Sequence, residues 1–446
     1  MSDSDGPGGP DEEEFRELLR AFLEGRTELD PAKLASAAGL PDNPAMLQQL
    51  VGHLQRAMNS SGDGIDWSLA RDQAAALAEG GTVVTLPEER ESAERALEVA
   101  ELWLGEATEL PQSPARPLVL SRREWTAATM NVWTQFAEPV AASIADALTN
   151  ALSKATPEEF EGMMPGAARI MRNLGGTLFS MQLGQVVGQL SGEVLSGGDI
   201  GIPLLPEGQA AILPQNATAF GQSLEQPLDQ VQLWVAIREL AHARLFRHAR
   251  WLGLQLVTAV TDYARGITID IDALEDVAAD LDIQDPAALR EAFQSGRLIP
   301  PRTDAQQQAL ARLETTLALV EGWVDVVTAS AARRLPAAPA IAEAVRRRRA
   351  AGGPAERALA ALVGLELRPR RLREAAAMWQ AVTDAVGPAA RDALWSHPDV
   401  VPTAADVDDP AALIARLTAG APEPDDVDRA IEDLLADEGG ERPTEE

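Results

Sequence analysis

The sequence contains no cysteine, and this single absence excludes several kinds of chemistry. A chain without thiols cannot form disulfides, thiolate metal sites or iron–sulfur clusters, and it cannot use a cysteine nucleophile. The pattern of a secretory signal is not seen in the first residues either. The first residues are rich in Gly, Pro and Asp instead of basic and apolar, and no run of about 18 apolar residues is free of charge. We therefore expect a soluble cytoplasmic protein.

Positive charge is scarce relative to negative charge. The 446 residues include 38 Lys and Arg against 69 Asp and Glu, so the formal net charge is −31. Partners rich in phosphate bind to clustered positive charge, and we therefore expect neither nucleic acid nor a membrane as a partner. Apolar residues make up 46% of the chain, which is enough for a sizeable core in one large domain or in two or three smaller ones.

Helical signals dominate the chain between two acidic ends. Alanine- and leucine-rich stretches of helical length recur, and only 200–205 and 210–213 are short apolar runs bounded by Gly and Pro. We expect a mainly α fold with a small β-hairpin or an edge strand. We expect acidic tails at residues 1–12 and 420–446. Between them we expect an amino-terminal helical region at 13–115, a core with the candidate site at 116–335 and a carboxy-terminal helical region at 336–419.

Two helix starts and one packing surface can be predicted from local patterns. Ser121–Glu124 is a capping box, and Thr156–Glu159 combines a cap, a proline in the first turn and a glutamate. Gly184, Gly188 and Gly192 recur every four residues and so share one helical face. Polar residues interrupt this stretch, which favours close packing of two helices in a soluble core over a membrane dimer.

Common nucleotide and hydrolase motifs are absent. Neither of the two lysines follows a Gly-rich loop as in a P-loop, and no Gly-x-Gly-x-x-Gly or Gly-x-Ser-x-Gly occurs. Four histidines are the candidates for acid–base or metal chemistry: His53, His242, His248 and His397. Because His242 and His248 lie close together in an apolar helical stretch, the candidate site is sought there.

The segment before His242 reads Arg238-Glu239-Leu240-Ala241-His242. Positions 238 and 242 lie one helical turn apart and face the same way, with Glu239 beside them. In a His-Glu-x-x-His helix the two imidazoles bind zinc while the glutamate polarises the metal-bound water. Here an arginine stands in the place of the first histidine. An ordinary ion pair on a helix is the alternative interpretation of these side chains.

Several further segments accompany this helix, which runs through Trp234–Phe246. They are Trp251-Leu252, Leu317–Asp325, Arg347–Pro354, Gly364–Arg371 and Trp395–Asp399. Taken together, these segments resemble one family, the actinobacterial zincin-like metallopeptidases. Its members are described as hydrolases, as zinc-dependent metalloproteases, or without an activity. The resemblance covers most of residues 15–420.

The resemblance implies a zincin-like core over residues 116–335 and a set of site residues. Glu321 stands where a carboxylate from a later helix completes the metal site of such proteins, so the zinc ligands would be His242 and Glu321, with Glu239 as the general base. Asp325, one turn beyond Glu321, would orient a ligand. The implied activity is the zinc-dependent hydrolysis of peptide or amide bonds.

Arg238 departs from the family pattern and leaves two functions open. A guanidinium stays protonated and has no lone pair for a metal, so zinc would be bound weakly or lost. Arg238 could instead take the place of the metal and pair with Glu321 or Glu239. The chain would then be either a zinc-dependent hydrolase or a non-catalytic descendant that uses its cleft to bind a peptide or a small-molecule ligand. No pattern indicates the oligomeric state.

Three neighbouring features have simpler interpretations. His248 could become a third ligand only if the chain turned after His242, but Leu245 stands where such a turn needs glycine, so we expect an exposed histidine near the helix end. The run at 210–213 is either an edge strand that pairs with a peptide or a plain buried strand. The four arginines at 346–349 predict a solvated helix end.

Overall fold

The computed structural model describes residues 65–155, 164–267, 302–354, 357, 360 and 370–419. The predicted acidic tails and the predicted helix start at Thr156–Glu159 lie outside the described residues.

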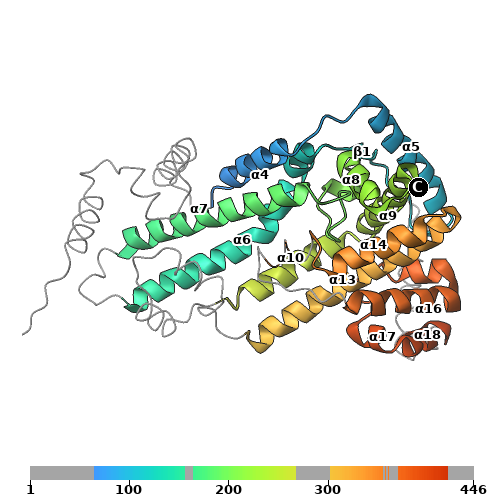
Figure 1. Ribbon diagram of the computed structural model, residues 1–446. Coiled ribbons are helices and arrows are strands. Elements are labelled where there is room, and N and C mark those ends of the chain that lie inside the picture. The colour runs from blue at the N-terminus through green and yellow to red at the C-terminus, as the bar shows by residue number, and fades with distance from the viewer. Residues whose placement is uncertain are drawn as a thin grey trace, which may run out of the picture. The chain divides into compact units, whose positions relative to one another are not determined.

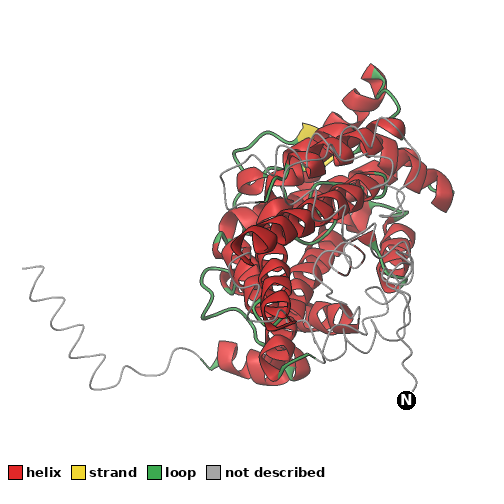
Figure 2. Cartoon of the chain, turned by 90° about the vertical axis from the view of Figure 1, so that its left-hand side faces the viewer, coloured by secondary structure: helices red, strands yellow, loops and turns green. Residues whose placement is uncertain are grey.

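The fold is mainly helical, as predicted (Figures 1 and 2). In chain order its elements are α4 (Ser68–Gly80), α5 (Pro87–Leu104), β1 (Leu118–Val119), α6 (Arg122–Ala155), α7 (Met164–Ser191), the 3-10 helix η2 (Pro206–Gly208), β2 (Ala211–Ile212), α8 (Pro214–Leu224), α9 (Leu228–His248), α10 (Trp251–Ala264), α13 (Asp304–Ala331), the 3-10 helix η3 (Ala332–Arg334), α14 (Ala338–Ala350), α16 (Arg370–Ala393), α17 (Ala404–Asp408) and α18 (Pro410–Thr418). Among these helices, none is long and apolar enough to cross a membrane.

The described residues contain one small sheet, in which β1 pairs with β2 in parallel and Leu118 lies opposite Ala211. On its other side β2 forms an antiparallel bridge to Ser196. The run at 210–213 therefore contains a strand, as predicted, but it does not pair with 200–205 in a hairpin. Its parallel partner, β1, lies far upstream in the sequence, as expected for parallel strands, which need a long crossover connection. A short apolar run does not show which distant segment it will pair with.

Two local predictions for the helices are confirmed. The N–H of Ser121 donates to the Glu124 carboxylate at 2.7 Å and the N–H of Glu124 donates to the Ser121 hydroxyl at 3.2 Å, so a capping box starts α6. A Cβ on Gly184 of α7 would lie 2.7 Å from the Ala70 carbonyl of α4, which shows the close packing of two helices. Gly192 lies beyond the end of α7.

The chain folds into two compact units. The first comprises Met1–Leu77, Trp133–Gly188 and Val260–Gln308, and the second comprises Ala78–Val132, Gln189–Ala259 and Ala309–Glu446. Every residue of the candidate site described below belongs to the second unit. The five regions expected from the sequence stay a prediction.

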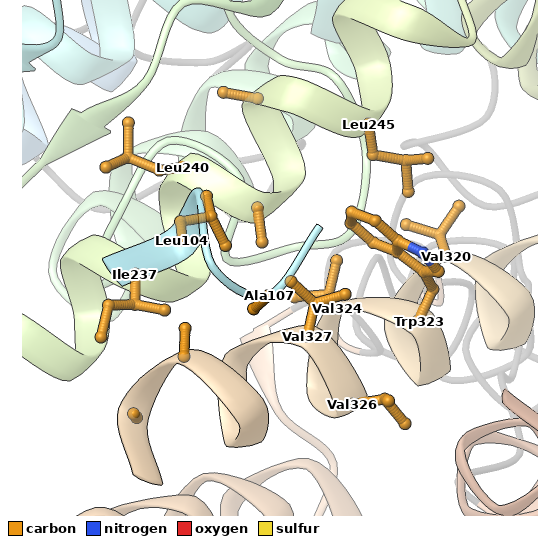
Figure 3. Close-up of a cluster of buried hydrophobic side chains, with 14 of the residues drawn as sticks. Leu104, Ala107, Ile237, Leu240, Leu245, Val320, Trp323, Val324, Val326 and Val327 are labelled. Carbon is orange, nitrogen blue, oxygen red and sulfur yellow. The ribbon is translucent and has the colours of Figure 1, made fainter. Parts of the chain in front are cut away.

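Apolar side chains from α5, α9 and α13 form the centre of the second unit (Figure 3). Leu104, Ile237 and Trp323, one from each helix, are completely buried. A Cβ on Gly322 would lie 2.7 Å from the Ala376 backbone nitrogen, so α16 packs directly against α13. Because burial of apolar surface is the main stabilising term in folding, about 25 cal/mol per Å², this packing fixes where the polar side chains of α9 and α13 meet.

Candidate functional site

The central part of helix α9 is buried on all sides. Every residue from Trp234 to Leu245 is buried, including the polar residues Arg238, Glu239, His242 and Arg244. A buried polar or charged group is costly unless it is hydrogen-bonded or paired. The partners of these four side chains therefore define what the helix does.

His242 meets Glu321 directly. The Nε2 nitrogen of the His242 ring lies 3.0 Å from Oε1 of Glu321, which projects from α13. The His242 side chain is 1% exposed and that of Glu321 is 7% exposed, so the contact is shielded from solvent. The two residues expected to meet across a long stretch of sequence are thus neighbours.

Arg238 binds the same carboxylate from one turn earlier in α9. Its guanidinium donates to Oε2 of Glu321 and, at 2.6 Å, to Oδ1 of Asp325. The guanidinium carbon also lies 5.9 Å from the centre of the Trp234 ring, within the range of a cation–π contact. The structure therefore brings Arg238, His242, Glu321 and Asp325 together in one cluster, while the roles assigned to them stay predictions.

A second arginine completes the cluster, and no sequence pattern indicates it. Arg349, near the end of α14, donates to Oε2 of Glu321 and, at 3.3 Å, to the carbonyl of Asp199. The predicted solvated helix end is therefore wrong for Arg349, whose side chain is 14% exposed. It holds for Arg347, which is 79% exposed and pairs with Glu343. The packing of α14 decides which of its arginines faces the cluster. The four arginines have the same side chain, so the sequence alone does not distinguish them.

The charges around Glu321 determine its ionisation. Burial alone would raise the pKa of Glu321, but Arg349, Arg238 and His242 together hold that pKa well below its usual range. Glu321 is consequently a carboxylate at all ordinary pH values. In the same way the carboxylate outweighs burial and raises the pKa of the Arg349 guanidinium.

Glu239 faces the backbone rather than an open space. Its Oε2 accepts the N–H of Gly198 at 2.7 Å and its Oε1 accepts the N–H of Ala211 at 2.9 Å, and it also has a hydrogen bond with the side chain of Ser196. Burial raises the pKa of the Glu239 carboxyl, against the charge of His242 and these hydrogen bonds. Glu239 thus ties α9 to strand β2 and to the segment before it.

Glycines in the segment 197–201 lie directly on the cluster. A Cβ on Gly198 would come within 3.0 Å of both Glu239 and His242, and a Cβ on Gly201 would come within 2.5 Å of Oε1 of Glu321. Gly201 also has a φ of +77°, which disfavours other residues. The backbone of this segment therefore fills the space next to the three side chains.

A recess of about 250 Å³ lies near another face of α9, lined by Leu240 and Arg244. Residues of helix α5, among them Glu94 and Glu98, and the segment 112–117 also line it. None of the clustered residues around Glu321 is among its lining residues.

The comparison with known families decides the identity of the chain. Residues 65–414 match the family model described as zincin-like metallopeptidase, and this match spans well over half of the sequence. The chain belongs to the zincin-like metallopeptidase family. Its predicted place in an actinobacterial group of that family stays a prediction. No curated protein matches the chain.

A solved structure shares the fold of this zincin-like chain. It is the crystal structure of a protein from Chloroflexus aurantiacus that is described as "a putative hydrolase with a novel fold". The two chains are 21% identical, the TM-score is 0.53, and the match covers 80% of this chain and 100% of the other. At this identity the likeness is evidence for the fold alone.

Zincin-like metallopeptidases are expected to hold zinc, and the residues present here do not fit it. Zinc would be bound by His242 and Glu321, but Arg238 and Arg349 both donate to Oε2 of that carboxylate and place two positive charges beside the position of a cation. Metal-bound histidines usually donate their second N–H, but the buried Nδ1 of His242 has no partner among the described residues. Within the same residues, no three His, Cys, Asp or Glu could hold a metal ion together.

Two further predictions can be compared with the zincin-like fold. His248 is the last residue of α9 and is exposed, as expected. The run at 210–213 is completely flanked, since the N–H of Gly197 donates to the Ala211 carbonyl on one side and β1 pairs on the other. The run is therefore a plain buried strand, and the edge-strand interpretation for peptide binding is wrong.

Proposed function

We propose that this chain is a non-hydrolytic member of the zincin-like metallopeptidase family. One observation carries the proposal: Arg238 and Arg349 both donate to Oε2 of Glu321, the candidate metal ligand whose other oxygen faces His242. An arginine cannot donate a lone pair to a metal, and its positive charge repels a cation. In this proposal the former site residues serve to hold α9 and α13 together.

The environment of Glu239 supports the same function. A general base needs to reach the water or group whose proton it takes. Both oxygens of Glu239 are already used by backbone N–H groups, of Gly198 and Ala211. Glu239 is therefore better placed to stabilise the fold than to activate water.

The alternative is a zinc-dependent hydrolase of peptide or amide bonds, as the family membership allows. In that case Arg238 and Arg349 would have to leave Glu321. Breaking a buried ion pair usually costs about 3–5 kcal/mol, so zinc would have to offset a large penalty. The described geometry favours the non-hydrolytic function for this reason.

Metal content and activity of the unaltered protein test the proposal. We expect elemental analysis of protein purified without added metal, and again after incubation with zinc and removal of the excess, to find far less than one zinc per chain. We also expect no hydrolysis of a mixture of peptide and amide substrates above a zinc-only blank. One tightly bound zinc per chain, or hydrolysis that a chelator abolishes, would contradict the proposal.

A non-hydrolytic member would act by binding, and we propose a peptide or a small molecule as its ligand. The described strands do not support binding of an extended peptide at a sheet edge, because β2 is flanked on both sides and the Val119 carbonyl of β1 accepts a hydrogen bond from Arg90 at 3.1 Å. A ligand would instead be held by side chains. Equilibrium dialysis against a labelled peptide library, with bound peptides identified by mass spectrometry, tests this part.

A further inference from the structure

We infer that Arg238 and Arg349 act together as the replacement for one divalent metal ion, and that removing either one alone leaves the site closed to metal. The inference rests on the proposed function, because it concerns how the metal was replaced. The inference assigns a role to Arg349, which lies outside both the motif helix α9 and the helix that carries Glu321. Two guanidinium groups carry the same total charge as one zinc ion.

The geometry divides the Glu321 carboxylate among three partners. Oε1 contacts Nε2 of His242, while Oε2 accepts hydrogen bonds from both Arg238 and Arg349. The two arginines come from different helices, α9 and α14, and so approach the same oxygen independently. A metal-bound carboxylate would present its lone pairs to the cation, and here guanidinium groups take up those of Oε2.

Arg349 is held in place without the help of Arg238. Its guanidinium also donates to the Asp199 carbonyl at 3.3 Å, and the neighbouring Arg348 lies 3.6 Å from the Asp199 carboxylate. Arg348 also donates to the Glu193 carbonyl. The end of α14 is thus fixed over the segment that covers the cluster, and a change at position 238 leaves these contacts untouched.

If both arginines exclude the metal, restoring the family motif at position 238 should not by itself restore metal binding. Arg238→His recreates a His-Glu-x-x-His helix and, with Glu321, a two-histidine and one-carboxylate donor set of the kind that binds zinc. Arg349 remains on Glu321 in this variant, and its charge opposes a cation at the same oxygen. We therefore expect Arg238→His alone to bind metal at least a hundredfold more weakly than Arg238→His combined with Arg349→Gln, which should bind one ion per chain.

Cobalt titration of full-length variants tests the inference, because tetrahedral Co²⁺ in the place of zinc gives visible absorption bands that need no enzymatic activity. The series comprises the unaltered protein, Arg238→His, Arg349→Gln and the double variant. A matched control combines Arg238→His with Arg347→Gln, which removes an exposed arginine from the same helix. A second control combines Arg238→His with Arg349→Lys, which keeps the positive charge. We expect one equivalent of Co²⁺ only in the double variant, with at least a hundredfold weaker binding in the others.

Each other outcome has a definite meaning. Full binding by Arg238→His or Arg349→Gln alone, or by Arg238→His combined with Arg347→Gln or with Arg349→Lys, overturns the inference and leaves the proposed function intact. Binding by the unaltered protein overturns the proposed function itself. No binding by the double variant, when circular dichroism shows native helix content and a cooperative thermal transition, also overturns the inference. If the double variant fails to fold, the combination with Arg349→Met replaces it, and the same outcomes apply.

Discussion

The Nε2 atom of His242 lies 3.0 Å from Oε1 of Glu321, in a contact that is almost completely shielded from solvent. Since Arg238 and Arg349 bind the other oxygen, this one carboxylate connects helices α9, α13 and α14. Such a group can stabilise the fold only while it is ionised. The consequences for stability can be measured without knowing a ligand or a substrate.

The free energy of unfolding should depend on pH because of Glu321. Its pKa in the folded protein lies well below the ordinary value of 4.5, so its contribution is fully present above about pH 4.5 and is lost as the pH falls toward the folded pKa. We expect Glu321→Gln to be less stable than the unaltered protein at pH 7 and the difference to shrink at pH 3. Urea unfolding at several pH values measures it. Glu98→Gln, at an exposed position of α5, controls for the loss of one carboxylate, and a constant difference would contradict the prediction.

Removing Arg238 should be costly. Arg238→Met leaves Glu321 and Asp325 without one buried partner, and we expect a loss of about 3 kcal/mol in the free energy of unfolding, at the lower end for broken buried pairs because Arg349 remains. Urea denaturation followed by circular dichroism measures the loss. Arg123→Met is the matched control, since Arg123 pairs with Glu79 at an exposed position and should contribute no more than about 1 kcal/mol. Equal losses for the two variants would be inconsistent with a buried ion cluster.

Gly201 and Gly352 form a second matched pair. Both have φ near +80°, so alanine at either position costs about 1–2 kcal/mol for the backbone alone. A Cβ on Gly201 would also come within 2.5 Å of Glu321, whereas a Cβ on Gly352 would meet nothing within 4 Å. We expect Gly201→Ala to lower the thermal midpoint more than Gly352→Ala does. Similar midpoints for both variants would show that the segment 197–201 does not press on the cluster.

Glu239 should behave as a structural residue. Glu239→Gln turns an amide N–H₂ toward a backbone N–H of either Gly198 or Ala211, and an unsatisfied buried donor costs about 1–3 kcal/mol. Chemical denaturation gives this value, and Glu98→Gln again serves as the exposed control. If Glu239 instead faced an open, water-filled site, the substitution would leave the stability almost unchanged.

The sequence predicted the main features of the fold because they depend on local patterns. The capping box at Ser121 needs only near neighbours along the chain, and the glycine repeat that includes Gly184 is a local pattern that indicates close helix packing without naming the partner helix. The proximity of His242 and Glu321 followed from the resemblance to the family rather than from periodicity. Arg349 could not be predicted, since four consecutive arginines look alike until α14 is oriented by its packing. Strand β1 was missed because a strand of two residues leaves almost no pattern.

Arg238 and Arg349 lie on separate helices, and this has an evolutionary consequence if they jointly replaced a metal. A single reverse mutation at either position would give up a buried ion pair while regaining nothing, because the remaining guanidinium still repels the cation. Selection for stability would remove such an intermediate before the second change arose. Loss of the metal in this lineage would then be difficult to reverse, because each single reversion would lower the stability of the fold by a few kcal/mol.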